Sequence, residues 1–237
     1  MTAVTQILAT LAASPVPASA RTRAAEALSE VTAAAAQGAS APAVTALSAV
    51  AASLSTPPEA PVPGTTARYS AAWSAYLTAT AAASAAPADH ATTVVPTALA
   101  VAAEQGPRPD DVAAAAAAGL EVARRLDGVF ADALGAFDRV ATIGRLAAVA
   151  AAGRLLGLSA GRQAEAYGIA GTQAAGFAAV TGPAGALQIG KAAFDAVEAA
   201  YLARAGYTAG PAGIEGRRGF AALLAPAADL TALAEYT

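Results

Sequence analysis

The stretch that decides the fold class is TIGRLAAVAAAGRLLG, residues 142–157. Alanine dominates it, and alanine is the best helix former because it loses no side-chain entropy when it is ordered. The stretch closes at Gly157, and glycine commonly follows the last residue of a helix. We therefore predict a helix over residues 142–156.

The rest of the chain shares this composition. Of its 237 residues, 56% are hydrophobic, 13% are charged and only 5% are aromatic. An alanine-rich, aromatic-poor chain favours helices whose axes pack closely, and no segment of useful length alternates apolar and polar residues as a strand would. We predict an all-α fold, a compact multi-helix domain that spans residues 1–237.

Proline and glycine mark where the helices end. The segment 56–64 carries four prolines and closes with Gly64, so it predicts a rigid turn that no helix can continue. Loops are predicted at residues 87–93 and 211–219. The predicted helices cover residues 2–13, 19 to about 38, 41–54, 65–86, 95–105, 109 to about 126, 142–156, 159–179 and 187–205, and two short helical pieces follow.

Charge and residue counts exclude several function classes. The net charge is −3, so no basic stripe is present to bind nucleic acid. The absence of cysteine excludes disulfides and thiolate metal sites, and one histidine without a dense carboxylate cluster predicts no metal site. The glycine-rich stretches do not follow a strand, which argues against a dinucleotide cofactor. We expect no cofactor.

Two apolar segments bear on localisation. Residues 1–13 lack the basic start of a signal peptide. The uncharged stretch 166–190 is long enough to span a bilayer, but it holds threonines, glutamines, a proline and many glycines. A buried helix pair in a soluble core is the favoured interpretation, so we expect a cytoplasmic protein without a membrane partner.

Three of the few aromatic residues lie close together in the sequence. Tyr69, Trp73 and Tyr76 are spaced i, i+4 and i+7, which places them on one face of the predicted helix 65–86. Such a stripe is usually part of a core. Because aromatic residues are scarce in this chain, the stripe also suggests the lining of a pocket.

Five segments, in order along the chain, resemble the MmgE/PrpD family, which includes 2-methylcitrate dehydratase and cis-aconitate decarboxylase. VVPTALA (94–100) resembles the segment after the family's HPS, and FDRVATIG (137–144) resembles GFHPTATLG. GLS through GIAGTQAAG (157–176) resembles LLGL…ALGIAGSQAAG, and LQIGKAA (187–193) resembles KxLHxGxAA. GYT (206–208) with IEGRRGF (214–220) resembles GFTGP…LEGxxGF. They follow one another between residues 94 and 220.

The resemblance implies the helical domain of that family. Family members are usually about twice as long and carry an α+β lid domain after the LEGxxGF region. This sequence ends soon after that region, so we expect the helical domain without the lid. Family members generally dimerise through the helical domain, which implies a homodimer here.

The departures from the family pattern concern its acid–base residues. Where the family has the LDxDD acids, residues 79–88 hold Thr80, Ser84 and otherwise apolar side chains. The HPS histidine falls at Asp89 or His90, the GFHPT histidine at Asp138, the KxLH lysine at Gly185 and its histidine at Gln188. Dehydration or decarboxylation of a polycarboxylate needs cationic groups and a tuned acid–base pair. We therefore do not transfer the family activity.

Four polar residues at these positions are the candidate catalytic residues: Asp89, His90, Asp138 and Gln188. His90, the only histidine, could act as an acid or base because its ordinary pKa lies near 6.5, or it is simply a solvated loop residue. Asp138 could be a base, or it caps the helix near Thr142 or pairs with Arg139. Gln188 could donate a hydrogen bond to a substrate, or it is a polar group of the core.

The candidate substrate-binding residues are Tyr69, Trp73, Tyr76, Thr142 and Lys191. Such a site suits a small, mainly hydrophobic molecule better than a tricarboxylate. We therefore predict a repurposed MmgE/PrpD-like enzyme, a lyase, isomerase or cyclase that catalyses an elimination, isomerisation or cyclisation in bacterial secondary metabolism. The alternative is a non-catalytic partner or scaffold that dimerises with a full-length relative.

Overall fold

The computed structural model describes residues 4–57, 59–210 and 213–236. These residues form ten α-helices, two 3₁₀ helices and one pair of two-residue strands, which confirms the predicted all-α fold. The elements are α1 (Val4–Ala13), α2 (Ala18–Gly38), α3 (Pro42–Leu54), β1 (Ala60–Pro61), β2 (Arg68–Tyr69), α4 (Ala71–Ala85), α5 (Ala91–Gln105), α6 (Pro109–Phe130), η1 (Ala131–Ala133), α7 (Arg139–Leu155), α8 (Ala160–Thr172), α9 (Gly182–Arg204), α10 (Phe220–Leu224) and η2 (Leu230–Tyr236).

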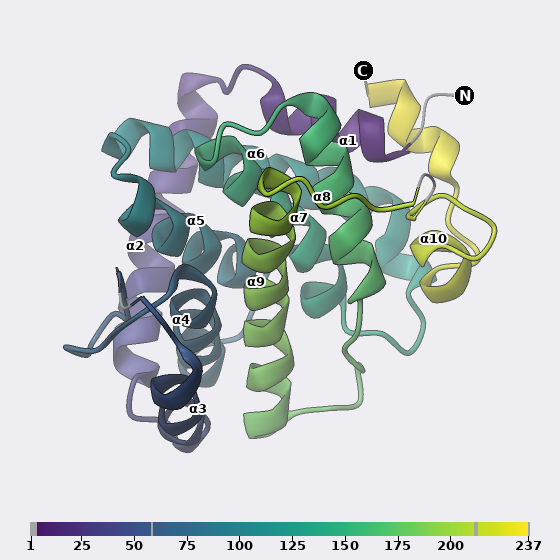
Figure 1. The fold of residues 1–237 in the computed structure, drawn as a ribbon. Coiled ribbons are helices and arrows are strands. Elements are labelled where there is room, and N and C mark those ends of the chain that lie inside the picture. Colours follow the sequence, from purple (N-terminus) through teal and green to yellow (C-terminus); the bar gives the residue numbers. More distant parts are fainter. Residues whose placement is uncertain (1–3, 58, 211–212, 237) are drawn as a thin grey trace.

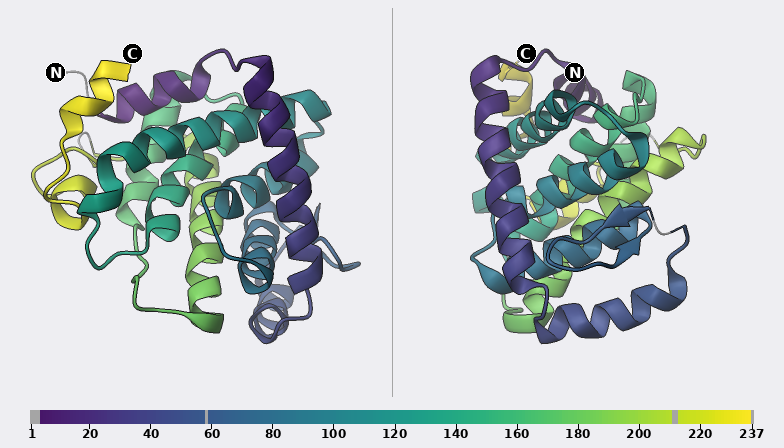
Figure 2. Two further views of the ribbon diagram at one scale, coloured as in Figure 1. Left: turned by 180° about the vertical axis from the view of Figure 1, so that it is seen from behind. Right: turned by 90° about the vertical axis from the view of Figure 1, so that its left-hand side faces the viewer.

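Helix α9 stands near the middle of the molecule (Figure 1) and packs against α4, α7, α8, α5 and α3. Helix α7 lies beside it and also packs against α5 and α6. The long helix α2 runs along one side, across α4 and α6, as both views of Figure 2 show. Helix α1 and the C-terminal η2 contact each other at one end of the molecule.

Small residues let these helices approach closely. Every residue from 141 to 153 in α7 is buried, and six of these thirteen residues are alanine. At Gly38 in α2, a Cβ atom would collide with the backbone carbonyl of Ala81 in α4. At Gly190 in α9, a Cβ atom would lie 2.7 Å from the carbonyl oxygen of Tyr76. The core is thus built largely by close backbone approach rather than by large side chains.

The prediction of one helix over residues 65–86 was wrong at its start. Residues 68–69 form strand β2, which pairs antiparallel with β1, and α4 begins only at Ala71. The backbone N–H of Glu59 donates to the carbonyl of Tyr69 at 3.1 Å, which extends the pairing. Tyr69 is therefore a buried strand residue and does not share a helical face with Trp73 and Tyr76.

Other helix boundaries also differ from the prediction. Helix α6 ends at Phe130 rather than about 126, and α7 begins at Arg139 rather than 142. Helix α5 begins at Ala91 rather than 95 and contains Pro96 in its interior. Helix α8 ends at Thr172 rather than 179, and α9 begins at Gly182 rather than 187, with Pro183 in its first turn. The start of the first predicted helix and residues 211–212 of the predicted C-terminal loop lie outside the described residues. Among the helices that the structure describes, none has the length and apolarity needed to cross a membrane.

Candidate functional site

His90 and Asp127 form the pair around which the candidate site is arranged. His90 immediately precedes α5 and Asp127 lies near the end of α6, and the His90 Nε2 atom is 3.0 Å from Asp127 Oδ1. Both side chains are mostly buried, with 15% and 18% exposed. The other ring nitrogen, Nδ1, is buried and has no hydrogen-bond partner among the residues that the structure describes. Asp127 had not been identified from the sequence.

Arg139, the first residue of α7, completes this arrangement. Its guanidinium hydrogen-bonds both carboxylate oxygens of Asp127. Burial of Asp127 acts to raise its pKa, but the hydrogen bonds from Arg139 and His90 outweigh burial, and the pKa is lowered. Asp127 therefore stays ionised, accepts the Nε2–H of His90 and fixes the ring orientation.

The loop before α9 brings Asp138 and Gln188 close together. The backbone N–H of Asp138 donates to the carbonyl of Gly176 at 3.1 Å. Gln188 Oε1 accepts from the N–H of Phe177 at 3.0 Å, and its Nε2 donates to the Phe177 carbonyl at 3.2 Å. Gly176 has a φ of 123° and lies between the two side chains, where a Cβ atom would meet Gln188 Oε1 at 3.5 Å and Asp138 Cβ at 3.6 Å.

The carboxylates of Asp89 and Asp138 both cap helices. Asp89 Oδ1 accepts from the backbone N–H groups of Ala91 and Thr92 at 2.9 and 3.3 Å. Asp138 Oδ1 accepts from the N–H of Ala141 at 2.7 Å. A side-chain oxygen at this position satisfies a backbone donor that has no partner within the helix. Each carboxylate thus has a structural role in addition to any chemical one.

Trp73 and Tyr76 stack on one another at 5.8 Å and meet a third aromatic ring edge-on. That ring is Phe194 in α9, with centroid distances of 5.3 Å to Trp73 and 5.9 Å to Tyr76. We refer to Trp73, Tyr76 and Phe194 as the aromatic cluster; all three are partly exposed. Phe194 was not singled out in the sequence because it lies far from the other two along the chain.

A buried ion pair lies between α7 and α9, next to the aromatic cluster. Arg145 and Asp195 are joined at 3.1 Å, and Lys191 also binds Asp195, one turn away on α9. Burial lowers the pKa of Arg145, opposed by the charge of Asp195, and burial raises the pKa of Asp195, opposed by Arg145 and Lys191. Lys191 Nζ also lies 4.8 Å from the ring centroid of Phe194.

Several buried polar atoms around this ion pair lack hydrogen-bond partners. They are Arg145 Nη1, Thr142 Oγ1 and Thr80 Oγ1. Buried polar groups are nearly always satisfied, so each of these atoms calls for an explanation such as a water molecule or a ligand. Thr142 is fully buried and lies one turn after Asp138 in α7, while Thr80 faces Gly190 in α9.

The structure thus brings most of the candidate residues onto neighbouring elements. His90, Asp127 and Arg139 link the start of α5 to the start of α7, and the loop around Gly176 links the start of α7 to the first turns of α9. Lys191 follows Gln188 by three positions on α9, so the two share one side of that helix. Tyr69, in strand β2, is buried in a hydrophobic cluster against which Trp73 and Tyr76 pack. In the described part of the chain, no three side chains of His, Cys, Asp or Glu are grouped as a metal ion would require.

The structure is thus an all-α bundle around a central helix, with polar side chains gathered at the starts of α5 and α7 and in the first turns of α9. The chain matches the family model of the MmgE/PrpD N-terminal domain over residues 2–233, nearly its whole length, and belongs to that family. A search of curated proteins gave no match.

Proposed function

We propose that this chain is a repurposed MmgE/PrpD-like enzyme that catalyses a proton-transfer reaction, an isomerisation, elimination or cyclisation, on a small and mainly hydrophobic molecule. The observation that carries the proposal is the His90–Asp127 pair. It holds a histidine ring by one nitrogen and leaves the other nitrogen buried and unpartnered.

The chemistry follows from the tautomer that this pair favours. When neutral His90 donates its Nε2–H to Asp127, Nδ1 carries no hydrogen and can accept a proton. When His90 then becomes protonated, the carboxylate of Asp127 balances the new charge. Such a base exchanges a proton with a carbon or oxygen acid at neutral pH without a cofactor. Because Nδ1 is sealed from solvent, a substrate reaches it only when the His90 ring or a neighbouring side chain shifts.

The surroundings support an apolar substrate. The aromatic cluster offers flat apolar surface where α4 packs on the middle of α9. The cationic side chains near it, Arg145 and Lys191, are both paired with Asp195. A tricarboxylate would need several unpaired cations, whereas one carbonyl or hydroxyl group could be oriented by Gln188 or Thr142. The alanine-rich, lysine-poor composition is typical of high-GC bacteria, and by analogy with such proteins we propose a role in secondary metabolism.

The test does not need a known substrate. The protein is incubated in D₂O with small-molecule extracts of its source, and products are compared by mass spectrometry for wild type and His90→Ala. We expect at least one compound to be isomerised, or to gain deuterium, with wild type only. Once a substrate is found, His90→Ala should lower kcat by about 10²-fold or more. Asp132→Asn, an exposed carboxylate near the site, is the control. Full activity in folded His90→Ala would reject the proposal.

Self-association remains a prediction that one surface feature supports. Val50 and Leu54 are 49% and 63% exposed and lie four positions apart on α3, so they form an apolar strip on one side of that helix. A homodimer is the simplest closed assembly that would cover such a strip. Light scattering at micromolar concentration tests this, and a monomer would contradict it. The alternative role, as a non-catalytic partner, requires binding to a full-length relative in the same assay.

A further inference from the structure

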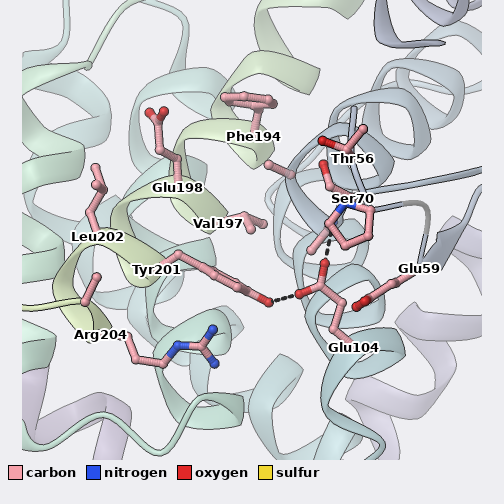
Figure 3. A pocket seen from close by; sticks show the side chains of 14 residues that line it. Thr56, Glu59, Ser70, Glu104, Phe194, Val197, Glu198, Tyr201, Leu202 and Arg204 are labelled. Carbon is pink, nitrogen blue, oxygen red and sulfur yellow. Dashed lines mark hydrogen bonds between the residues drawn. The ribbon is translucent and has the colours of Figure 1, made fainter. Parts of the chain in front are cut away.

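A cavity lies away from the His90–Asp127 pair, between the start of α4, the end of α5 and the C-terminal half of α9 (Figure 3). Its volume is about 630 Å³. Cavities of roughly 300–1,000 Å³ are typical of small-molecule sites. None of the residues predicted from the sequence to be catalytic or substrate-binding lines it.

One wall of this cavity is apolar. Phe194, Val197 and Leu202 contribute it from α9, and Ala71 and Ala72 contribute from the first turn of α4. Phe194 also belongs to the aromatic cluster, so the cavity shares this one side chain with that cluster. A ligand with an apolar body could bury that body against this wall and gain free energy in proportion to the apolar area removed from water.

The opposite side holds a firmly positioned carboxylate, Glu104. Its Oε1 accepts from the N–H of Ala71 at 2.8 Å, at the positive end of the α4 dipole. Its Oε2 accepts from the hydroxyl of Tyr201, as the dashed lines in Figure 3 show. Burial, together with the bond to Glu104, raises the pKa of Tyr201, so that hydroxyl remains a donor at neutral pH. Each carboxylate oxygen still has a second lone pair that can accept from a ligand.

Negative charge is in excess around this cavity. Glu59, Glu104 and Glu198 line it with a single cationic side chain, Arg204. The Arg204 guanidinium stacks on the ring of Tyr201, with 4.4 Å to the ring centroid. Across residues 4–57, 59–210 and 213–236, none of the three carboxylates belongs to an ion pair. Glu198 is held only by a hydrogen bond from Gln173 at 3.0 Å.

We propose that this cavity binds a small organic cation, in which an ammonium group is joined to an apolar body. The ammonium group lies by the carboxylates, with Glu104 as the fixed acceptor, and the apolar body packs against Phe194 and Val197. An anion is disfavoured by the three carboxylates, and a hydrated inorganic cation gains nothing from the apolar wall. None of His90, Asp127 and Arg139 lines this cavity, which shares Phe194 with the aromatic cluster, and the proposal does not depend on proton transfer by His90.

The experiment compares three probes of nearly equal size and different charge. These are 2-phenylethylammonium, 2-phenylethanol and 3-phenylpropionate, titrated at pH 7 and followed by calorimetry. Fluorescence of Trp73, the only tryptophan, gives a second readout because Phe194 contacts its ring. We expect the ammonium probe to bind about tenfold or more tightly than the other two, since opposite charges attract strongly where water is partly excluded.

Three variants locate the binding. Glu104→Gln should weaken the ammonium probe by about fivefold, and Ala72→Phe should abolish binding of all three probes by filling the cavity. Glu30→Gln, which removes the same charge at an exposed position of α2, should leave binding unchanged. Thermal melts confirm that each variant is folded, and Glu198→Gln replaces Glu104→Gln if the latter is not. Equal affinity for the alcohol, no binding of the ammonium probe, or undiminished binding to folded Ala72→Phe would each overturn the proposal.

Discussion

Arg145 in α7 and Asp195 in α9 form an ion pair in which each side chain is only 2% exposed. The Arg145 Nη2 atom lies 3.1 Å from Asp195 Oδ2, while Nη1 has no hydrogen-bond partner. Two charges removed from water in this way are held by their mutual attraction, and the loss of either one leaves the other buried and unpaired. The pair therefore couples α7 to α9 at the centre of the fold.

Replacement of Arg145 by methionine should strongly destabilise the protein. The variant leaves Asp195 with Lys191 alone, and Lys191 is 46% exposed. We expect the free energy of unfolding to fall by about 3–5 kcal/mol, measured by urea denaturation. The double variant Arg145→Met with Asp195→Leu should recover most of this loss, because no buried charge then remains. A double variant as unstable as the single one would contradict this account.

Acid should weaken the contribution of Glu121 to the stability of the fold. The hydrogen bond from Arg124 is the largest effect on the pKa of Glu121 and lowers it. Burial acts to raise this pKa, and Arg125 lowers it further, so that the pKa is about 2. A lowered carboxyl pKa stabilises the fold above the ordinary value of 4.5, and this stabilisation is lost as the pH falls through about 2. Glu121→Gln should cost about 1 kcal/mol or less at pH 7, because the pair is half-exposed. Urea denaturation at several pH values should show the difference from wild type shrinking with acid; a difference that grows would refute the assignment.

Two glycines in helices should respond oppositely to alanine. Gly38→Ala pushes a methyl group into the carbonyl of Ala81, where only backbone can yield, so α2 and α4 must separate. We expect a loss of about 1–3 kcal/mol, typical of overpacking. Gly161 lies in α8 with nothing within 4 Å of its would-be Cβ, so Gly161→Ala should stabilise by about 0.5–1 kcal/mol. Paired thermal melts decide this, and equal shifts in both variants would show that close packing at Gly38 is not limiting.

Trp73→Ala should lower stability and substrate affinity together. The variant removes a ring that packs on Tyr76 and Phe194, and a loss of about 2–3 kcal/mol is expected because the ring is only partly buried. Trp73→Phe keeps an aromatic ring and should lose about 1 kcal/mol or less. Urea denaturation and the KM for an identified substrate are the two readouts. An unchanged KM in folded Trp73→Ala would remove the aromatic cluster from the site.

We expect neither dehydration of 2-methylcitrate nor decarboxylation of cis-aconitate. Thr80, Asp138 and Gln188 stand where the family pattern has acids and histidines, and Arg145 is neutralised by Asp195. Both substrates are assayed with purified protein and with a known family enzyme as the positive control. Turnover of either at about 1 per second or faster would show that the site lies elsewhere.

The helices were largely predictable because their signals are local. Alanine-rich runs and closing glycines gave α2, α3 and α7 nearly at their observed bounds. Tyr69 was misplaced because a two-residue strand is too short to show alternation and because its pairing with Ala60 is made across a loop. The start of α5 was placed too late because residues 87–93 were assigned to a loop, whereas the Asp89 carboxylate accepts from the backbone N–H of Ala91 at the start of the helix.

The site was only partly predictable for the opposite reason. His90, Asp138 and Gln188 stood out by position in the family pattern. Their partners, Asp127 and the backbone of Phe177, are defined only by the fold. Arg145 did leave a signal, since it is the one charged residue between positions 141 and 153 of the sequence, and such charges are seldom buried unless they are paired. Asp195 left less of one, because Lys191 and Glu198 lie beside it in α9. Glu104 and Tyr201 left none, because their contact joins the ends of two helices far apart in the sequence.

The unbroken burial of residues 141–153 has a consequence for motion at the site. A helix with no solvent-facing side cannot fray or open without separating the surrounding helices, so its amide hydrogens should exchange only when the whole domain unfolds. Thr142 stands at the edge of that rigid segment, and Asp138 leads directly into it. Gln188 holds Phe177, whose side chain is 58% exposed in the loop that precedes α9. We therefore expect the α7 side of the candidate site to stay fixed unless the domain unfolds. Movement that accommodates a ligand should occur in the loop that contains Phe177.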